Sequence, residues 1–150
     1  MIIGICGLIG AGKDTIADHL VDDHSFVKLS FADKLKDSVA TMFDWNRDLL
    51  DGKTEQSRKW REQMDPFWSM ELKHEVTPRL VLQKFGTECM RDGFYDGIWV
   101  SLVKKKLKDN PQINWVIPDV RFENEANMIQ ELGGEVWWVQ RGDLPEWWGH

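Results

Sequence analysis

The stretch Gly7-Leu8-Ile9-Gly10-Ala11-Gly12-Lys13-Asp14-Thr15 decides the fold. Its spacing is a glycine, four residues, a second glycine and a lysine, and the apolar run Ile2–Cys6 comes directly before it. From Lys13 onward, apolar residues recur at the three- and four-residue spacing of an amphipathic helix. A glycine-rich turn between a buried strand and a helix lets backbone N–H groups converge on phosphate oxygens. The stretch therefore predicts a phosphate-binding loop, and the alternative is a glycine-rich turn followed by a surface lysine.

Individual residues of this loop have distinct expected roles. We expect contacts to ATP from Gly7, Gly10, Ala11, Gly12, Lys13, Asp14 and Thr15. Lys13 would reach the β and γ phosphates, which makes it a catalytic candidate. Asp14 stands where serine or threonine usually helps to hold Mg²⁺, and Thr15 follows it, so that either residue could serve the ion. Asp14 could also act on the molecule that accepts a phosphoryl group from ATP. Alternatively, its charge could simply stabilise the helix N-terminus.

A second group of charged residues follows the apolar run Ile113–Ile117. Open α/β sheets bind their ligands outside the carboxyl ends of the strands, so this group faces the expected site. Asp119 is predicted to hold Mg²⁺ or its water, with a helix-capping role as the alternative. Arg121 would neutralise charge on the phosphoryl group during its transfer from ATP. Glu125 would form an ion pair with Arg121 if both residues are helical, because they lie four positions apart.

The order of predicted elements indicates an α/β fold. Strands and helices are predicted at Ile2–Cys6, Lys13 to about His24, Phe26–Phe31, Lys34–Phe43, Pro78–Arg91, Ile98–Leu107, Ile113–Ile117, Phe122–Leu132 and Glu135–Gln140, whereas Asp44–Val76 resists assignment. We expect a three-layer sandwich with a small parallel sheet of about four strands and a helical insertion between strands 2 and 3. A single domain would span residues 1–150, with its core in residues 1–43 and 111–141 and the insertion at about residues 44–110.

The insertion offers candidates for binding an acceptor. Arg79 and Gln83 share one face of the predicted helix, where Arg79 could clamp a phosphate and Gln83 could bond a nucleobase edge. A merely solvated face would show the same spacing. Trp99 could stack on a base, although a core position is the alternative. Arg58 and Arg61 add further cationic candidates, with a solvated helix as their alternative.

Composition limits the class of protein. The chain has 150 residues, of which 29% are charged and 42% hydrophobic, as expected for a soluble globular protein. A net charge of -6 disfavours a nucleic-acid polymer as partner and favours small nucleotides. The two cysteines form no disulfide pattern, and the apolar start is too short for a signal peptide or a membrane span, so we expect a cytoplasmic protein. Nine tryptophans make a homodimer possible.

Several blocks of the sequence resemble the deoxynucleoside monophosphate (dNMP) kinases of tailed bacteriophages, which belong to the P-loop nucleoside-monophosphate kinase superfamily. The blocks that carry the resemblance, in order, are Gly10-Ala11-Gly12-Lys13-Asp14-Thr15, Ser30-Phe31-Ala32-Asp33 with Leu35-Lys36, Thr77-Pro78-Arg79, Gln83 with Phe85-Gly86-Thr87-Glu88, Ile98-Trp99-Val100, and Asp119-Val120-Arg121-Phe122 with Asn124-Glu125. Together they cover nearly the whole chain.

The resemblance implies transfer of the ATP γ-phosphoryl group to the 5′-phosphate of a deoxynucleoside monophosphate, with Mg²⁺. It implies that Lys13, Asp14 and Thr15 serve ATP and metal, and that Asp119, Arg121 and Glu125 form the transfer zone. It implies acceptor contacts from Arg79, Gln83, Arg91 and Trp99, with Ser30 and Asp33 near the sugar or phosphate. The host cytoplasm would be the location of a phage-encoded member. The alternatives are a kinase for another small acceptor, such as dephospho-coenzyme A, and a nucleotide-binding module without turnover.

Overall fold

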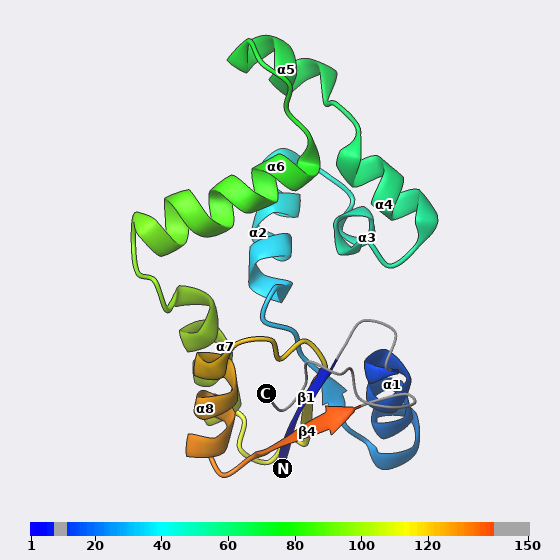
Figure 1. The fold of residues 1–150 in the computed structure, drawn as a ribbon, viewed down its shortest axis with the longest axis vertical. Coiled ribbons are helices and arrows are strands. Elements are labelled where there is room, and N and C mark those ends of the chain that lie inside the picture. Colours follow the sequence, from blue (N-terminus) through cyan, green and yellow to red (C-terminus); the bar gives the residue numbers. More distant parts are fainter. Residues whose placement is uncertain (8–11, 140–150) are drawn as a thin grey trace, which may run out of the picture. The chain divides into compact units, whose positions relative to one another are not determined.

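Four parallel strands form one sheet, and they come from the N-terminal and C-terminal parts of the sequence (Figure 1). They are β1 (Ile2–Gly7), β2 (Val27–Lys28), β3 (Trp115–Ile117) and β4 (Glu135–Val139), in the order β2-β3-β1-β4. Every pairing is parallel. This computed structural model describes residues 1–7 and 12–139. The predicted α/β fold class is confirmed.

The chain divides into two compact units. The sheet unit comprises residues 1–31 and 100–150, and the helical unit comprises residues 32–99. Within the described residues, no helix is both long and apolar enough to span a membrane.

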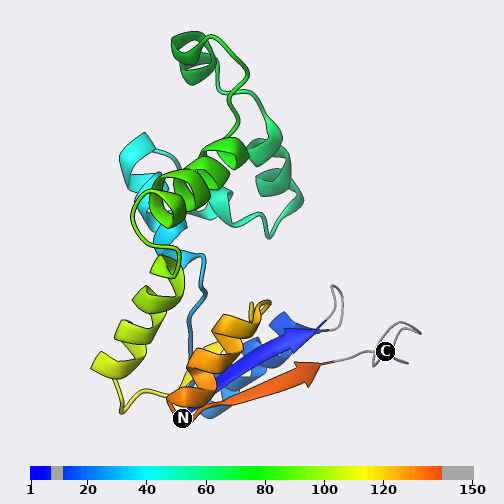
Figure 2. The same cartoon turned by 60° about the vertical axis from the view of Figure 1, so that its left-hand side comes forward.

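Alternating side chains of β1 face opposite sides of the sheet, as the two-residue period of a strand requires. Ile3 and Ile5 belong to one core cluster, which also holds Ala17 and Leu20 of α1 (Lys13–His24). Ile2 and Cys6 pack against the other cluster. The sheet therefore has an apolar layer on each face, and α1 covers one of them (Figure 2).

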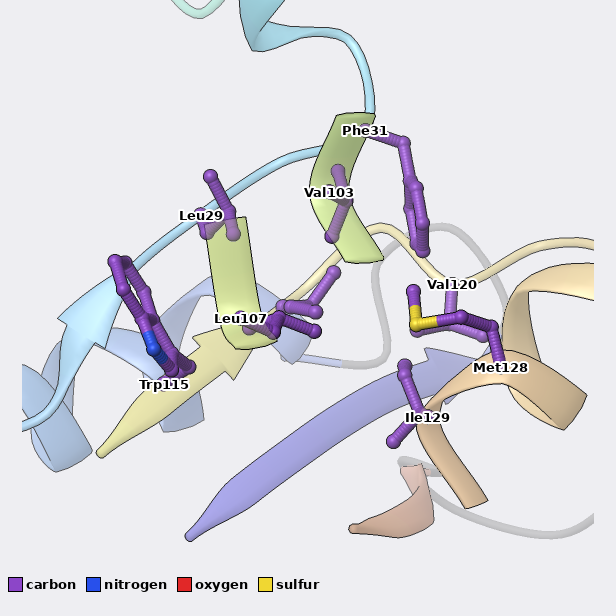
Figure 3. Close-up of a cluster of buried hydrophobic side chains, with 9 residues drawn as sticks. Leu29, Phe31, Val103, Leu107, Trp115, Val120, Met128 and Ile129 are labelled. Atoms are coloured by element: carbon purple, nitrogen blue, oxygen red, sulfur yellow. The ribbon is translucent and has the colours of Figure 1, made fainter. Parts of the chain in front are cut away.

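Helices α7 (Ile98–Asp109) and α8 (Glu123–Glu131) supply the cover of the opposite face. Figure 3 shows this cluster, in which buried Val103 and Leu107 of α7 lie over the sheet with Met128 and Ile129 of α8. Burial of aliphatic side chains of this size stabilises a fold by about 1.5–3 kcal/mol each. The result is the expected three-layer arrangement of helix, sheet and helix.

The second strand is much shorter than the predicted Phe26–Phe31, because Phe26 bonds α1 before it and Ser30 bonds a side chain after it. The Phe26 N–H donates to the carbonyl of Leu20 in α1 at 3.1 Å. Beyond Lys28, the Leu29 N–H still donates to the Val116 carbonyl at 2.9 Å. The Ser30 hydroxyl then donates to the Asp119 carboxylate. The third strand begins at Trp115 rather than Ile113. The predicted end of the last strand, Gln140, lies outside the described residues.

The helical unit consists of short helices, four of which begin at capping side chains. Its elements are α2 (Asp33–Phe43), α3 (Arg47–Asp51), α4 (Glu55–Glu62), α5 (Pro66–Leu72), α6 (Pro78–Gln83) and the π-helix η1 (Lys84–Asp92). Asn46, Thr54, Asp65 and Thr77 each accept a hydrogen bond from a backbone N–H in the first turn of the following helix. Such caps contribute about 1 kcal/mol each and define helix starts that apolar spacing does not reveal.

The core of the helical unit forms around Val39, Leu50 and Leu82. Beside it, Arg47 donates to the carboxylates of Asp37 and Asp51 at 2.6 Å each. The predicted helix Pro78–Arg91 begins at Pro78 as expected, but its hydrogen-bonding pattern changes from α to π at Lys84. The prediction of a helix over Pro78–Arg91 is confirmed, and its second half is π-helical rather than α-helical.

Candidate functional site

The glycines that flank the loop occupy positions that only glycine fits. A Cβ atom on Gly7 would overlap the backbone carbonyl oxygen of Val139 on the neighbouring strand. Gly12 precedes α1 in the left-handed conformation, with φ of 94°. Because glycine has no side chain, it leaves the first N–H groups of α1 uncapped for an anion. The predicted ATP contacts Gly10 and Ala11 lie outside the described residues.

Lys13 bonds the last residue of β1. Its Nζ atom donates to the Gly7 carbonyl oxygen at 3.1 Å and is partly buried. This bond joins the first residue of α1 to the end of β1. Asp14 and Thr15 follow in the first turn of α1, and both side chains are exposed.

Asp119 lies just after β3 and is fixed by residues at the end of β2. Its Oδ2 atom accepts from the Ser30 hydroxyl at 2.5 Å and from the Phe31 N–H at 3.2 Å. The carboxylate therefore lies at the carboxyl ends of the parallel strands, the edge at which open α/β sheets bind ligands. The resemblance places Ser30 near the sugar or phosphate of the acceptor. In the structure its hydroxyl donates to Asp119.

Glu125 binds backbone rather than a guanidinium. Its Oε1 atom accepts from the N–H groups of Arg121 at 2.8 Å and Phe122 at 3.0 Å. The expected ion pair with the Arg121 side chain does not form among the described residues, because α8 begins only at Glu123 and the four-residue helical spacing does not apply. Instead, Glu125 holds the turn that carries Asp119 and Arg121.

The protonation of Glu125 reflects its surroundings. Burial raises the pKa of its carboxyl group, and the two N–H donors and the Arg121 charge oppose that rise, while the Asp119 charge adds to it. The side chain is 8% exposed. Exposed Arg121 has a guanidinium without a partner among the described residues, so it is available to an anionic ligand.

Mg²⁺ fits this set of residues. Residues 1–7 and 12–139 contain no cluster of three His, Cys, Asp or Glu side chains suited to a metal. Mg²⁺ in nucleotide sites needs no such cluster, since it is commonly held by one or two carboxylates, water and the phosphates themselves. Asp119, with Asp14 and Thr15, provides oxygen donors of this kind.

A cavity of about 410 Å³ lies within the helical unit. It is lined by Leu35, Arg79, Leu82, Gln83, Gly86, Thr87, Arg91 and Trp99. Four of the predicted acceptor residues are thus brought together, and two of them, Arg79 and Arg91, carry positive charge. Leu35, Leu82 and Gly86 add an apolar wall that sequence reasoning did not assign to the site, although Leu35 and Leu82 occupied apolar helix positions.

The two cavity arginines are paired with carboxylates. Arg79 contacts Glu62 at 2.5 Å, and Arg91 contacts Asp96 at 3.0 Å. All four side chains are 45% exposed or more, so each pair is worth at most about 1 kcal/mol and can yield to a ligand phosphate. The Trp99 indole N–H donates to the Gly86 carbonyl oxygen at 3.1 Å.

Three other predicted acceptor residues do not line this cavity. Arg58 donates to the backbone carbonyls of Gly52 and Lys53. Arg61 donates to the Leu50 carbonyl, and Asp33 accepts from Arg47. These side chains hold the helical unit together, which the charge pattern alone did not distinguish from ligand binding.

No family model matches this chain, but a known viral protein resembles it over most of its length. It is 35% identical over 152 residues to the "Putative deoxynucleotide monophosphate kinase" of Acanthamoeba polyphaga mimivirus, covering 94% of this chain and 74% of that protein. It is 39% identical over 57 residues to the deoxynucleoside-5′-monophosphate kinase of Escherichia phage T5, covering 37% of this chain and 22% of that protein. The extent of the first match, joined to the loop of Lys13 and the parallel sheet behind it, means that the chain belongs to the deoxynucleoside monophosphate kinase family.

Proposed function

We propose that this protein transfers the γ-phosphoryl group of ATP to the 5′-phosphate of a deoxynucleoside monophosphate, giving the diphosphate and ADP. The observation that carries the proposal is the loop geometry, in which Lys13 bonds the Gly7 carbonyl, in a member of this kinase family. Both relatives are named as kinases of deoxynucleotide or deoxynucleoside monophosphates. These names support a deoxynucleoside monophosphate as the acceptor.

The donor would bind at the loop and at the N-terminus of α1. The N–H groups at the start of α1 and the partial positive charge of that helix favour phosphate oxygens. Lys13 would exchange its bond to the Gly7 carbonyl for the β and γ phosphates of ATP. Asp14, Thr15 and Asp119 would hold Mg²⁺, which supplies charge neutralisation at the phosphates.

The acceptor would bind in the cavity of the helical unit. Its volume of about 410 Å³ lies in the range of small-molecule sites. Arg79 and Arg91 supply two cations for the 5′-phosphate, and exchange of their surface carboxylate partners for a phosphate costs little. Gln83 offers a donor and an acceptor to a base edge, and Trp99 offers a flat apolar ring.

The reaction asks for little covalent chemistry from the protein. An oxygen of the acceptor phosphate forms a bond to the γ-phosphorus as the bond from that phosphorus to the β–γ bridging oxygen breaks, and the electron pair leaves with ADP. A phosphate monoester has its second pKa near 6, so the attacking oxygen needs no general base at neutral pH. Lys13 and Arg121 would stabilise charge on the group in transfer, whereas Glu125 would position the Arg121 turn.

The proposed partners are small nucleotides in the cytoplasm. The net charge of -6 opposes binding to a nucleic-acid backbone, while the cavity arginines provide local positive charge for a mononucleotide.

A coupled assay of ADP formation tests the proposal. ATP and Mg²⁺ are supplied with each of the four deoxynucleoside monophosphates, and separately with dephospho-coenzyme A. We expect acceptor-dependent ADP release with at least one deoxynucleotide. Turnover with dephospho-coenzyme A alone would reassign the acceptor, and tight ATP binding with no product from any acceptor at millimolar concentration would refute a kinase.

A further inference from the structure

The cavity depends on a change of helix type. Arg79, Gln83, Thr87 and Arg91 recur every four residues along α6 and η1, and all four line the cavity. The first part of this segment is α-helical, and Lys84–Asp92 is π-helical. Segments of π-helix are rare in proteins. Those that do occur are frequently found at functional sites.

The wide turn explains why Arg91 lines the cavity. Four residues of α-helix rotate by roughly 400°, so each step of four overshoots one turn by roughly 40°. After three such steps, Arg91 would lie about 120° away from Arg79, on the flank of the helix. A π-helix needs about one more residue for each turn, so a step of four falls short of a full turn. The two π steps therefore oppose the drift of the α step, and Arg91 lines the same cavity as Arg79.

Two neighbours hold the wide turn at Gly86. The Trp99 indole N–H donates to the Gly86 carbonyl oxygen at 3.1 Å. A Cβ atom at Gly86 would also lie 3.0 Å from Leu35 Cδ2, so this turn of η1 packs tightly on α2. The carbonyl of Gly86 is thus directed by a side chain distant in sequence, and not only by its own helix.

We propose that Trp99 is a positioning residue, whose indole N–H fixes the wide turn at Gly86 and thereby places Arg91 on the face of the cavity that binds phosphate. This role rests on the proposed acceptor function of the cavity. It differs from stacking on a base, because it requires the N–H group and acts on the phosphate through Arg91.

The substitution Trp99→Phe separates the two roles, since it keeps an aromatic ring and removes the donor. Binding of 2-deoxyribose 5-phosphate, which has the phosphate and no base, is measured by calorimetry. We expect the variant to bind it about threefold to tenfold more weakly, the effect of one lost hydrogen bond. Trp115→Phe is the matched control, because Trp115 Nε1 donates to the Asn110 carbonyl in the sheet unit. It should leave binding unchanged.

A double-mutant cycle with Arg91→Gln tests the route. If Trp99 acts through Arg91, Trp99→Phe will weaken sugar-phosphate binding in the native background and have no further effect beside Arg91→Gln. Additive losses in the cycle would overturn the proposal. Unchanged sugar-phosphate binding in Trp99→Phe, with weaker binding of whole nucleotides, would overturn it in favour of stacking.

A measurement on the unsubstituted protein covers the case in which Trp99→Phe does not fold. The indole N–H of Trp99, observed by nuclear magnetic resonance, should exchange with solvent much more slowly than that of an indole without a hydrogen bond. Exchange at the unbonded rate would contradict the proposal. Failure of the proposed kinase function is distinct, since that protein would then release no ADP with any deoxynucleotide.

Discussion

Ser30 and Asp119 are 89 positions apart in the chain, and a hydrogen bond of 2.5 Å joins the Ser30 hydroxyl to the Asp119 carboxylate. It links the ends of two adjacent parallel strands at the edge of the sheet where ligands bind. The bond leaves the carboxylate little freedom to rotate.

Loss of this bond should affect the metal more than the acceptor. In Ser30→Ala, we expect the Mg²⁺ concentration for half-maximal activity to rise about threefold to tenfold, because the carboxylate loses one of its donors. Ser30→Thr keeps the hydroxyl and should stay close to the native protein. Mg²⁺ titration of ADP formation is the measurement. A raised KM for the deoxynucleotide with unchanged Mg²⁺ dependence would assign the hydroxyl to the acceptor instead.

Removal of the Lys13 charge should abolish turnover and leave the fold intact. Lys13→Met removes the only ammonium group that bonds the Gly7 carbonyl in the described part of the loop, and we expect kcat to fall at least about a hundredfold. Lys105→Met, on an exposed lysine of α7 in the same unit, is the control and should remain active. Native-like circular dichroism with unchanged kcat in Lys13→Met would refute the assigned role.

Arg79 should contribute to acceptor binding, and Arg58 should not. We expect Arg79→Gln to raise the KM for the deoxynucleotide roughly tenfold or more, since a charge-assisted bond to phosphate contributes about 1.5–3 kcal/mol. Arg58→Gln is the matched control, because its guanidinium bonds the Gly52 and Lys53 carbonyls outside the cavity. The KM for ATP should stay constant in both variants. Equal effects of the two substitutions on the acceptor KM would argue against the cavity as its site.

Stability should depend on pH through Glu125. Because burial raises the pKa of this carboxyl group in the fold, the folded state binds its proton more tightly than the unfolded state does. Its contribution to the free energy of unfolding is therefore fully present below about pH 4.3, the ordinary pKa of glutamate, and declines as the pH rises through the raised pKa. Glu125→Gln, which carries no charge, should lack this decline. Urea unfolding of both proteins from acid to neutral pH measures it, and parallel curves would contradict it.

Gly4 tests the packing of β1 against α8. A Cβ atom at Gly4 would lie 2.6 Å from Ile129 Cδ1 and 2.9 Å from Val120 Cγ2, so we expect Gly4→Ala to lower the free energy of unfolding by about 1–3 kcal/mol. Ile129→Val removes the Cδ1 atom and alone costs about 0.5–1.5 kcal/mol. The double variant should therefore lose less than the sum of the two single losses. Additive losses in urea unfolding would show that the two sites are independent.

The sequence predicted the elements whose hydrogen bonds are local. Ile2–Cys6 and the helix from Lys13 follow from apolar spacing, and the structure has β1 and α1 there. The length of β2 could not be predicted, because Phe26 bonds α1 and Ser30 bonds Asp119 across the sheet. The Asp119 partner is 89 positions away from Ser30 in the sequence.

The candidate site shows the same division. The glycine-rich motif predicted Lys13, and the shared helix face predicted Arg79 and Gln83. The π-helical segment that carries Arg91 contacts Trp99 and Leu35 at Gly86, and these contacts are not visible in the sequence. Arg58 and Arg61 resembled ligand-binding arginines in sequence, and in the structure one terminal nitrogen of each guanidinium donates to backbone carbonyls of the helical unit. Only tertiary structure reveals such bonds.

The position of the helical unit in the chain has a consequence for evolution. It begins after β2 and ends just inside α7, so the sheet unit by itself retains a strand, most of a helix and the next strand in sequence. A parallel pair of strands requires a crossover of about a dozen residues or more, and α7 lies on that crossover between β2 and β3. Because residues 32–99 form a unit of their own and hold the proposed acceptor cavity, sequence changes there would alter the proposed acceptor site and leave the strands and the helix beside the phosphate-binding loop unchanged.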